Sequence, residues 1–510
     1  MILYVTSDKK YIKVKEANDY ELSILKDSLK KRIKNWYFNP LVKANKWDGY
    51  VNFFKYNSAP IGLWNEIYNI CQSYSIDLKI EGIKNIFDLS IDYNEFIEWV
   101  NDFFKDNDIK PRDYQIKTAY DILKYKYCTS SVTTSAGKTL IAFIVFAYIK
   151  THSLGNKYLI IVPTTILTTQ MMEEFIKYNN DKIDLSFSLI YSNSKVVSED
   201  PNVVIGTYQS LVKFDKEFLS NFDTIYVDEC HKAGASSIRN IIKKCSRVNY
   251  KFGMSGTIIK DNTAEYYTIL SLLGPVLNRI SPDFLFKEGF APFAKFRIVM
   301  LNYNRKDISE TLFNLRTNKN LEKSKAFYYE KVTVLNNNER LNFILKMIGE
   351  TDKNSMVLFS DIKNKYGYKI YEYLKNNTDK ICYYVDGNIE QDHRSYYQSE
   401  METGNNKVII ASFLTFATGI SIKNIHYIFF AESYKSEILV KQSIGRGMRQ
   451  LKDKSDFYII DFVDNLSFNN NKNYLYKHGV ERYKIYKQYS SDIKIFNVDR
   501  PFSLSFDKLL

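Results

Sequence analysis

Short apolar runs alternate with helix-length stretches along this chain, and the alternation occurs twice. The runs of the first set lie at 159–162, 203–205, 225–227 and 252–254, and those of the second at 356–359, 383–385, 408–411, 427–430 and 457–460. Near-continuous apolar strands separated by helical segments indicate parallel sheets that are covered on both faces. The pattern therefore predicts an α/β fold with two parallel-sheet domains in tandem.

Domain boundaries follow from breaks in this pattern. The junction between the two sheets is expected between Gly274 and Pro292, and a polar, helix-permissive insertion follows at 302–325. An asparagine-rich run at 469–473 predicts a loop ahead of a basic, tyrosine-rich tail. We expect a small N-terminal α+β accessory domain at 1–100, the first sheet domain at 101–280, the second at 281–465 and a short C-terminal extension at 466–510.

Composition narrows the class of protein. The chain has 510 residues, enough for about three domains. A formal net charge of +13 indicates a polyanionic partner. Because Lys, Asn, Ile and Tyr are all abundant, as an AT-rich coding sequence would give, the distribution of charge is more informative than its sum.

Positive charge and aromatic rings concentrate in the segment 30–56. Cations that follow a phosphate backbone, with rings available for stacking, are typical of nucleic-acid surfaces. We expect Lys30, Lys31, Arg32 and Lys34 to contact nucleic acid. The alternative is a small core with a solvated basic face. The segment also contains Lys43, Lys46 and Lys55, the rings of Trp36, Tyr37, Phe38, Trp47, Tyr50, Phe53 and Phe54, and the single acid Asp48.

The five cysteines are scattered and form no Cys-x-x-Cys pair, which indicates reduced thiols and no structural zinc. No apolar run approaches the length of a membrane span, and the run at 2–5 is too short for a signal peptide. The sequence therefore predicts a cytoplasmic protein without a membrane partner.

A phosphate-binding loop is predicted at 134–139, ahead of the apolar helical stretch 140–149. Small residues let backbone N–H groups converge on phosphates, Lys138 adds a positive charge, and the Thr139 hydroxyl can bind Mg²⁺. Val132 stands where the usual pattern has glycine, so a helix N-terminus with an incidental lysine is the alternative. The loop residues expected to bind ATP are Thr134, Ser135, Ala136, Gly137, Lys138 and Thr139.

A pair of acids, Asp228 and Glu229, follows the apolar run that ends at Val227. Ligands of open α/β sheets gather at the carboxyl ends of strands, so these carboxylates are expected beside the phosphates. Asp228 would hold Mg²⁺, and Glu229, also near the metal, would orient and deprotonate the attacking water. The alternative for an acidic pair alone is a helix cap or a solvated turn.

Read in order, these motifs resemble those of the superfamily 2 helicases, from about Lys110 to Gln450. The matching segments are Pro-Arg-Asp-Tyr-Gln at 111–115, the loop at 134–139, Val-Pro-Thr at 162–164, Gly-Thr-Tyr-Gln-Ser at 206–210, Asp-Glu-Cys-His at 228–231, Ser-Gly-Thr at 255–257, 415–421 and 442–449. The resemblance implies two tandem RecA-like motor domains that hydrolyse ATP with Mg²⁺.

The same resemblance implies roles for further residues. Gln115, with Arg112, resembles the element that reads adenine, and Ser-Gly-Thr at 255–257 resembles the link between ATP state and domain closure. Arg446 and Arg449 resemble arginine fingers, and Gln442 would lie near the γ-phosphate or the attacking water. Gly419 is expected on the nucleotide side of the second domain. Positions that match the family's strand contacts are Pro163, Thr164, Thr207, Gln209, Ser210, Ser360, Asp386, Gly387, Thr415 and Thr418.

Within the superfamily, the segment 35–50, the loop at 134–139 and the chain length are similar to the UvsW-like recombination helicases of tailed bacteriophages. That resemblance implies a 3′ to 5′ DNA helicase in the host cytoplasm that acts on forks, junctions and R-loops in recombination, replication and repair. Its partners would be single-stranded and branched DNA, RNA within R-loops and replication or recombination proteins, and the motor would be monomeric.

Two other classes stay open at this point. One is a different nucleic-acid motor, either an RNA helicase or the translocase subunit of a restriction system. The other is a non-hydrolysing clamp or annealing factor, against which the presence of Lys138, Glu229 and Arg446 argues.

Overall fold

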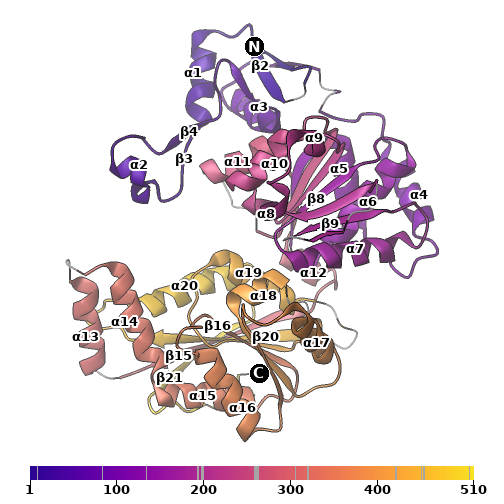
Figure 1. Cartoon of the computed structure of the whole chain (residues 1–510). Coiled ribbons are helices and arrows are strands. Elements are labelled where there is room, and N and C mark those ends of the chain that lie inside the picture. Colours follow the sequence, from indigo (N-terminus) through magenta and orange to yellow (C-terminus); the bar gives the residue numbers. More distant parts are fainter. Residues whose placement is uncertain are drawn as a thin grey trace. The chain divides into compact units, whose positions relative to one another are not determined.

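In a computed structural model the chain forms two compact units, Met1–Ser281 and Pro282–Leu510 (Figure 1). The structure describes all residues except 9, 83, 85, 134, 192–193, 197–199, 258–262, 305, 319–320, 420–421, 450, 452–453, 505 and 510, and leaves out the side chains of 194–196, 391 and 417–419. Among the described residues, no helix combines the length and apolar character needed to cross a membrane.

The first unit begins with a small four-stranded sheet of order β5-β2-β1-β6. Its apolar face packs against α1 (Asp19–Ser28) and α3 (Trp64–Ser73) around a core that includes Leu3, Ile12 and Ile67. The strands are β1 (Ile2–Val5), β2 (Tyr11–Lys15), β5 (Ser58–Pro60) and β6 (Lys79–Glu81).

A two-stranded hairpin of β3 (Lys30–Arg32) and β4 (Tyr50–Asn52) extends from this part (Figure 1). We call the segment 33–49 between its strands the arm. The arm contains a short turn of helix, η1 (Trp36–Phe38), and α2 (Pro40–Lys43).

The rest of the first unit is an eight-stranded sheet of order β10-β9-β11-β8-β12-β13-β7-β14, parallel except for the edge strand β10. The strands are β7 (Tyr127–Val132), β8 (Tyr158–Val162), β9 (Phe187–Tyr191), β10 (Ser194–Val196), β11 (Val203–Thr207), β12 (Thr224–Asp228), β13 (Tyr250–Ser255) and β14 (Val276–Ile280). The helices are α4 (Tyr93–Phe103), α5 (Asp113–Tyr125), α6 (Lys138–Thr151), α7 (Thr165–Asn179), α8 (Tyr208–Leu211), α9 (Lys216–Leu219), α10 (Ser236–Lys244) and α11 (Ala264–Leu273). Helix α6 is apolar on nearly all sides because it is buried against the sheet and its neighbours α5 and α7.

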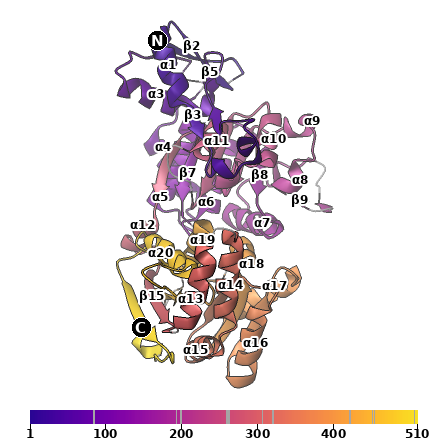
Figure 2. The ribbon, with the colours of Figure 1, turned by 90° about the vertical axis from the view of Figure 1, so that its left-hand side faces the viewer.

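The second unit is built on a seven-stranded, fully parallel sheet of order β17-β18-β16-β19-β20-β15-β21. The strands are β15 (Phe293–Asn302), β16 (Ser355–Phe359), β17 (Ile381–Val385), β18 (Lys407–Ser412), β19 (Tyr427–Phe430), β20 (Asp456–Asn465) and β21 (Ile493–Asp499), of which Figure 1 labels β15, β16, β20 and β21. The helices, labelled in Figure 2, are α12 (Pro282–Lys287), α13 (Lys306–Thr317), α14 (Lys323–Leu335), α15 (Asn338–Gly349), α16 (Tyr366–Asn377), α17 (Gln391–Glu402), α18 (Phe413–Gly419), α19 (Glu437–Gly447) and α20 (Tyr474–Tyr486).

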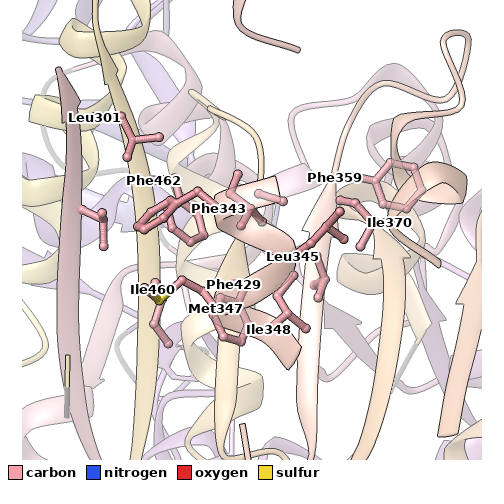
Figure 3. Close-up of a cluster of buried hydrophobic side chains, with 14 of the residues drawn as sticks. Leu301, Phe343, Leu345, Met347, Ile348, Phe359, Ile370, Phe429, Ile460 and Phe462 are labelled. Atoms are coloured by element: carbon pink, nitrogen blue, oxygen red, sulfur yellow. The ribbon is translucent and has the colours of Figure 1, made fainter. Parts of the chain in front are cut away.

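The core of the second unit lies between α15 and the strands it covers. Phe343, Met347 and Ile348 of α15 point toward Phe429 and Phe462 of the sheet (Figure 3). Within this core the guanidinium of Arg340 donates two hydrogen bonds to the Asp464 carboxylate, at 2.7 and 3.0 Å, so the two buried charges satisfy each other.

The prediction of two tandem parallel-sheet domains behind a small α+β part is confirmed. The polar insertion predicted at 302–325 contains α13 and the start of α14. Residues after 465 supply α20 and the edge strand β21, which pairs with β15. The bounds of the four predicted domains stay predictions.

Candidate functional site

The loop between β7 and α6 turns through two residues with left-handed backbone, Ser135 at φ 72° and Gly137 at φ 80°. Val132 is fully buried and is the last residue of β7, where it pairs with Ile280 of β14. The turn therefore starts after the strand has ended, and the position that carries valine instead of glycine needs no unusual backbone. Thr134 lies outside the described residues.

Two side chains at the start of α5 hold this loop. The Tyr114 hydroxyl and the Gln115 amide nitrogen each donate to the Ala136 carbonyl at 3.0 Å. The Gln115 amide oxygen accepts from the backbone N–H of Arg112 at 2.9 Å and so caps the helix. A Cβ at position 137 would collide with the Gln115 amide, which is a second reason for glycine there. The adenine-reading role of Arg112 and Gln115 stays a prediction.

Lys138, the first residue of α6, lies against both predicted carboxylates at the end of β12. Its ammonium donates to Glu229 Oε1 at 2.6 Å and lies 3.7 Å from Asp228 Oδ1. Burial by itself lowers the pKa of Lys138, but Glu229 and Asp228 outweigh it and raise that pKa above its usual value. Residues from two motifs far apart in the sequence thus form one charged cluster.

Glu229 is held from its other side by a second set of polar groups. The Ser255 hydroxyl donates to Glu229 Oε2 at 2.9 Å, and His231 Nδ1 lies 3.2 Å from the same oxygen. The backbone N–H of Thr257 donates to the Ser255 hydroxyl at 3.2 Å. Burial by itself raises the pKa of Glu229, but Lys138 and His231 hold that pKa well below its usual value. Glu229 is therefore a charged group in a fixed position.

Asp228 has a different environment. The Tyr226 hydroxyl donates to Asp228 Oδ1 at 3.0 Å, and both side chains are buried. Burial raises the pKa of the Asp228 carboxyl, and Lys138 opposes that shift. Two carboxylates at a strand end, with the Thr139 hydroxyl one residue after Lys138, suit a magnesium ion that takes its other ligands from phosphates and water. Among the described residues, no cluster of three or more His, Cys, Asp and Glu side chains forms a protein-only metal site.

The predicted arginine fingers lie in the second unit. Gln442 and Arg446 are half-buried residues of α19, and Arg449 follows the end of that helix. The Arg446 guanidinium lies over the Phe416 ring at 5.3 Å. A Cβ at Gly447 would overlap the Phe457 ring, so glycine lets α19 approach β20 closely. Gly419 is the last residue of α18, and the Thr418 side chain lies outside the described part.

The predicted strand contacts of the first unit follow the ends of β8 and β11. Pro163 and Thr164 come directly after β8, and Thr207 is the last residue of β11. The Thr207 hydroxyl donates to the Ser210 hydroxyl at 3.1 Å, both being buried, whereas Gln209 is exposed. Because parallel strands end at the same edge of the sheet, these residues share one edge with Asp228.

In the second unit, the pair Ser412 and Thr415 repeats the arrangement of Thr207 and Ser210. The Thr415 hydroxyl lies 2.7 Å from the Ser412 hydroxyl at the end of β18. Ser360, after β16, donates to Glu432 at 2.5 Å. The Asp386 carboxylate accepts from the Asn388 backbone N–H at 2.9 Å and so shapes its own loop, in which Gly387 is exposed.

The basic-aromatic segment divides into buried and exposed parts. The Arg32 guanidinium lies 3.5 Å from the Trp36 ring centroid and 4.7 Å from that of Tyr50, and the Lys31 ammonium lies 4.6 Å from that of Tyr267 in α11. Burial lowers the pKa of Lys31. Lys30 pairs with Asp48 at 3.3 Å. The exposed side chains of the arm include three lysines and three large apolar or aromatic residues, namely Lys34, Lys43, Lys46, Tyr37, Phe38 and Leu41.

Sequence reasoning missed several side chains of the first unit's site. Tyr226 could have been found, since residues two apart in a strand share a face and Tyr226 precedes Asp228 by two. Tyr114 adjoins the predicted Gln115. The contact of His231 with Ser255, at 2.8 Å, joins motifs on β12 and β13 and has no local signal.

The family models and relatives agree with this geometry. The model described as "Type III restriction enzyme, res subunit" matches residues 108–260, and "Helicase conserved C-terminal domain" matches 339–450. The chain is 30% identical to "ATP-dependent DNA helicase uvsW" of Enterobacteria phage T4, over 91% of this chain and 92% of that one. It is 22% identical to "Probable helicase D10" of Escherichia phage T5, over 70% of this chain and 73% of the relative.

One solved structure shows the shared fold. The restriction-modification enzyme LlaBIII bound to DNA matches with a TM-score of 0.54 at 14% identity, over 79% of this chain and 32% of that one. The sequence relationship over almost the whole of both chains, together with the two helicase domain models, shows the family: the chain belongs to the UvsW-like ATP-dependent DNA helicases of superfamily 2.

Proposed function

We propose that this helicase uses ATP and Mg²⁺ to move along a DNA strand and to remodel branched DNA, namely forks, four-way junctions and R-loops. The observation that carries the proposal is the cluster in which Lys138 binds both Glu229 and Asp228 at the carboxyl edge of the first large sheet. Kinship to uvsW of phage T4 supports DNA as the nucleic acid. Its place of work would be the host cytoplasm, with replication or recombination proteins as further partners.

Each residue of the cluster has a distinct task in hydrolysis. Lys138 and the N–H groups of the loop bind the phosphates, while Thr139 and Asp228 would hold the magnesium ion, with Glu229 beside it. The ion, when bound, neutralises charge on the phosphates. Glu229 accepts a proton from the attacking water. Because Lys138 neutralises Glu229 in the structure, Glu229 becomes a free base only after Lys138 has turned toward a phosphate.

The Ser255–His231 pair fixes the direction of the Glu229 carboxylate. The Ser255 hydroxyl, at 2.9 Å, and His231 Nδ1, at 3.2 Å, both contact Glu229 Oε2. Only Oε1 of Glu229 is therefore left for Lys138 or for water. Since Thr257 donates its N–H to the same Ser255 hydroxyl, movement of the catalytic carboxylate is transmitted to the segment at 255–257.

The second unit would complete the site by domain closure. We propose that Arg446 and Arg449 reach the γ-phosphate from α19, with Gln442 beside the water, when ATP and DNA are bound. Arginine side chains suit this task because a planar guanidinium binds two phosphate oxygens at once. Alternate closing and opening would convert ATP turnover into stepping along the strand.

A substrate panel tests the proposed function. We expect ATP turnover and strand separation to be greater on forks, four-way junctions and R-loops than on linear duplex DNA, and absent on duplex RNA. Equal activity on duplex RNA would favour an RNA helicase, and ATP-driven movement on duplex DNA without preference for branches would favour a restriction-type translocase.

The arm provides a separate prediction. Replacing Lys34, Lys43 and Lys46 with glutamine should weaken DNA binding, because these exposed cations can neutralise phosphates without a structural role inside the unit. The slope of log K against log salt should fall in magnitude by about 0.7–0.9 for each phosphate that the variant no longer neutralises. Fluorescence anisotropy with a labelled fork at several salt concentrations measures both effects.

A matched control replaces Lys13, Lys26 and Lys177, which are exposed lysines of the same unit outside the arm. The control should keep the wild-type slope. An unchanged slope in the arm variant would show that the arm's charge does not bind DNA, and would assign the segment to packing through Arg32 and Lys31.

A further inference from the structure

A pocket of about 650 Å³ opens in the second unit, apart from the residues of the ATP site. Its lining comes from α14, from the ends of β16 and β18, from the loop after β19 and from α20. β16 connects to one side of the sheet, toward β17, and β19 to the other, toward β20. The pocket therefore lies where the chain connections of two neighbouring strands leave in opposite directions, which is the usual ligand crevice of a parallel sheet.

Aromatic rings form two walls of this pocket. On one side Tyr434 stacks on the buried Phe413, with centroids 4.5 Å apart and planes at 19°. On the other side Phe327 of α14 lies 5.2 Å from the ring of His478 and 6.1 Å from that of Tyr474, both in α20. A pocket of this size between two aromatic walls suits a flat heterocyclic ring such as a nucleobase.

The polar groups of the pocket favour an anion beside that ring. Ser360 lies at its base, where Lys331 donates to the Ser360 hydroxyl at 3.1 Å and pairs with Glu432 at 3.1 Å. Within the described part of the chain, the other two lysines of the lining, Lys323 and Lys435, have no acidic partner. Glu432 and Asp361, the latter 3.9 Å from the Lys331 ammonium, offset the charge of Lys331, so the positive charge available to a ligand comes from Lys323 and Lys435.

The walls are braced before any ligand binds. Glu330 of α14 accepts from the backbone N–H of Leu475 in α20 at 2.7 Å. Arg482 of α20, itself paired with buried Asp461, donates to the Tyr434 carbonyl at 2.9 Å. Both walls are thus attached to the same helix, so the pocket is preformed rather than created by closure.

The pocket lies beside residues that are predicted to contact the DNA strand. Ser360 and Ser412 line it, and Ser412 is the hydrogen-bond partner of Thr415. Ser360 and Thr415 are among the positions at which phosphates of the tracked strand are expected on this unit. A strand that follows these hydroxyls places its bases at the mouth of the pocket.

We propose that this pocket receives one unstacked base of the bound DNA strand, with Tyr434 as the stacking ring and Lys323 and Lys435 on the flanking phosphates. This inference rests on the proposed function and adds a specific base-holding site to it. A base held at each step prevents the strand from sliding back while the motor domains reopen.

Single-strand binding with one base removed tests the inference. The probe is a short oligothymidylate, just long enough to bind, that carries one abasic residue at each position in turn. With a non-hydrolysable ATP analogue and the full chain, we expect affinity to fall at one position by about five-fold or more, as loss of one stacked base predicts. Tyr434→Ala should weaken binding of the intact strand by a similar factor and abolish the difference between positions.

Matched variants distinguish the loss of base stacking on Tyr434 from damage to the fold. Tyr434→Phe retains the ring and should behave as wild type, as should Tyr373→Ala, which removes an exposed tyrosine of α16. Ser324→Trp places a large side chain in the pocket from α14 while Tyr434 is retained, and should also abolish the positional effect.

Equal affinity at all abasic positions, or a positional effect that survives Tyr434→Ala, would overturn the inference while leaving the motor intact. If thymidine monophosphate alone bound as tightly as the strand and with the same Tyr434 dependence, the occupant would be a free nucleotide and the inference would be wrong. Absence of any single-strand binding would overturn the proposed function as well.

Discussion

Glu229→Gln is expected to lower DNA-stimulated ATP turnover by about 10²–10⁴-fold while ATP binding persists. Glutamine has the same shape and still accepts the hydrogen bond from Ser255, but it cannot take a proton from water. The change also removes one negative partner of Lys138, so that the lysine is freer to bind phosphate. Steady-state turnover with saturating single-stranded DNA, together with binding of a fluorescent ATP analogue, measures the two effects separately.

Glu173→Gln is the matched control, because Glu173 is an exposed residue of α7 in the same unit. It should hydrolyse ATP at the wild-type rate. Wild-type turnover in Glu229→Gln would remove Glu229 from the proton-accepting role and would leave Asp228 as the candidate. Loss of ATP binding in Glu229→Gln would instead assign Glu229 to holding the loop.

Arg446→Ala is expected to lower turnover by about 10³–10⁵-fold, the range for loss of an arginine finger. The residue belongs to the second unit, whereas Lys138 and Glu229 belong to the first. Because its proposed contact forms in the closed, reacting state, binding of ATP to the first unit should change little. Single-turnover hydrolysis with DNA present measures the chemical step, and equilibrium titration measures binding.

Two further variants test this prediction. Arg446→Lys should recover little activity, since an ammonium cannot make the paired hydrogen bonds of a guanidinium. Lys369→Ala removes an exposed cation of α16 and should have no effect on turnover. Near-normal hydrolysis in Arg446→Ala would contradict the proposed site across two domains and would restrict the chemistry to the first unit.

Local sequence patterns predicted much of the architecture. Apolar runs such as 159–162 and 408–411 are buried strands of the two parallel sheets, because strands covered on both faces favour near-continuous apolar sequence. The strand β7 was not predicted, since its centre is the polar run Thr129-Ser130-Ser131. Thr129 and Ser130 are nevertheless buried, and the Thr129 hydroxyl donates to the Gly274 carbonyl at 2.9 Å.

The sequence by itself determined the family and the two sheets and predicted the chemistry-bearing residues, because each motif is a local pattern at a strand end or helix start. Only the tertiary structure decided which of those residues lie in contact. It placed Lys138 on Glu229, engaged Arg32 and Lys31 with the rings of Trp36 and Tyr267, and built a pocket from α14, α20 and three strand ends. Such contacts join residues far apart in the chain, and packing of the whole unit selects them, so no short pattern encodes them.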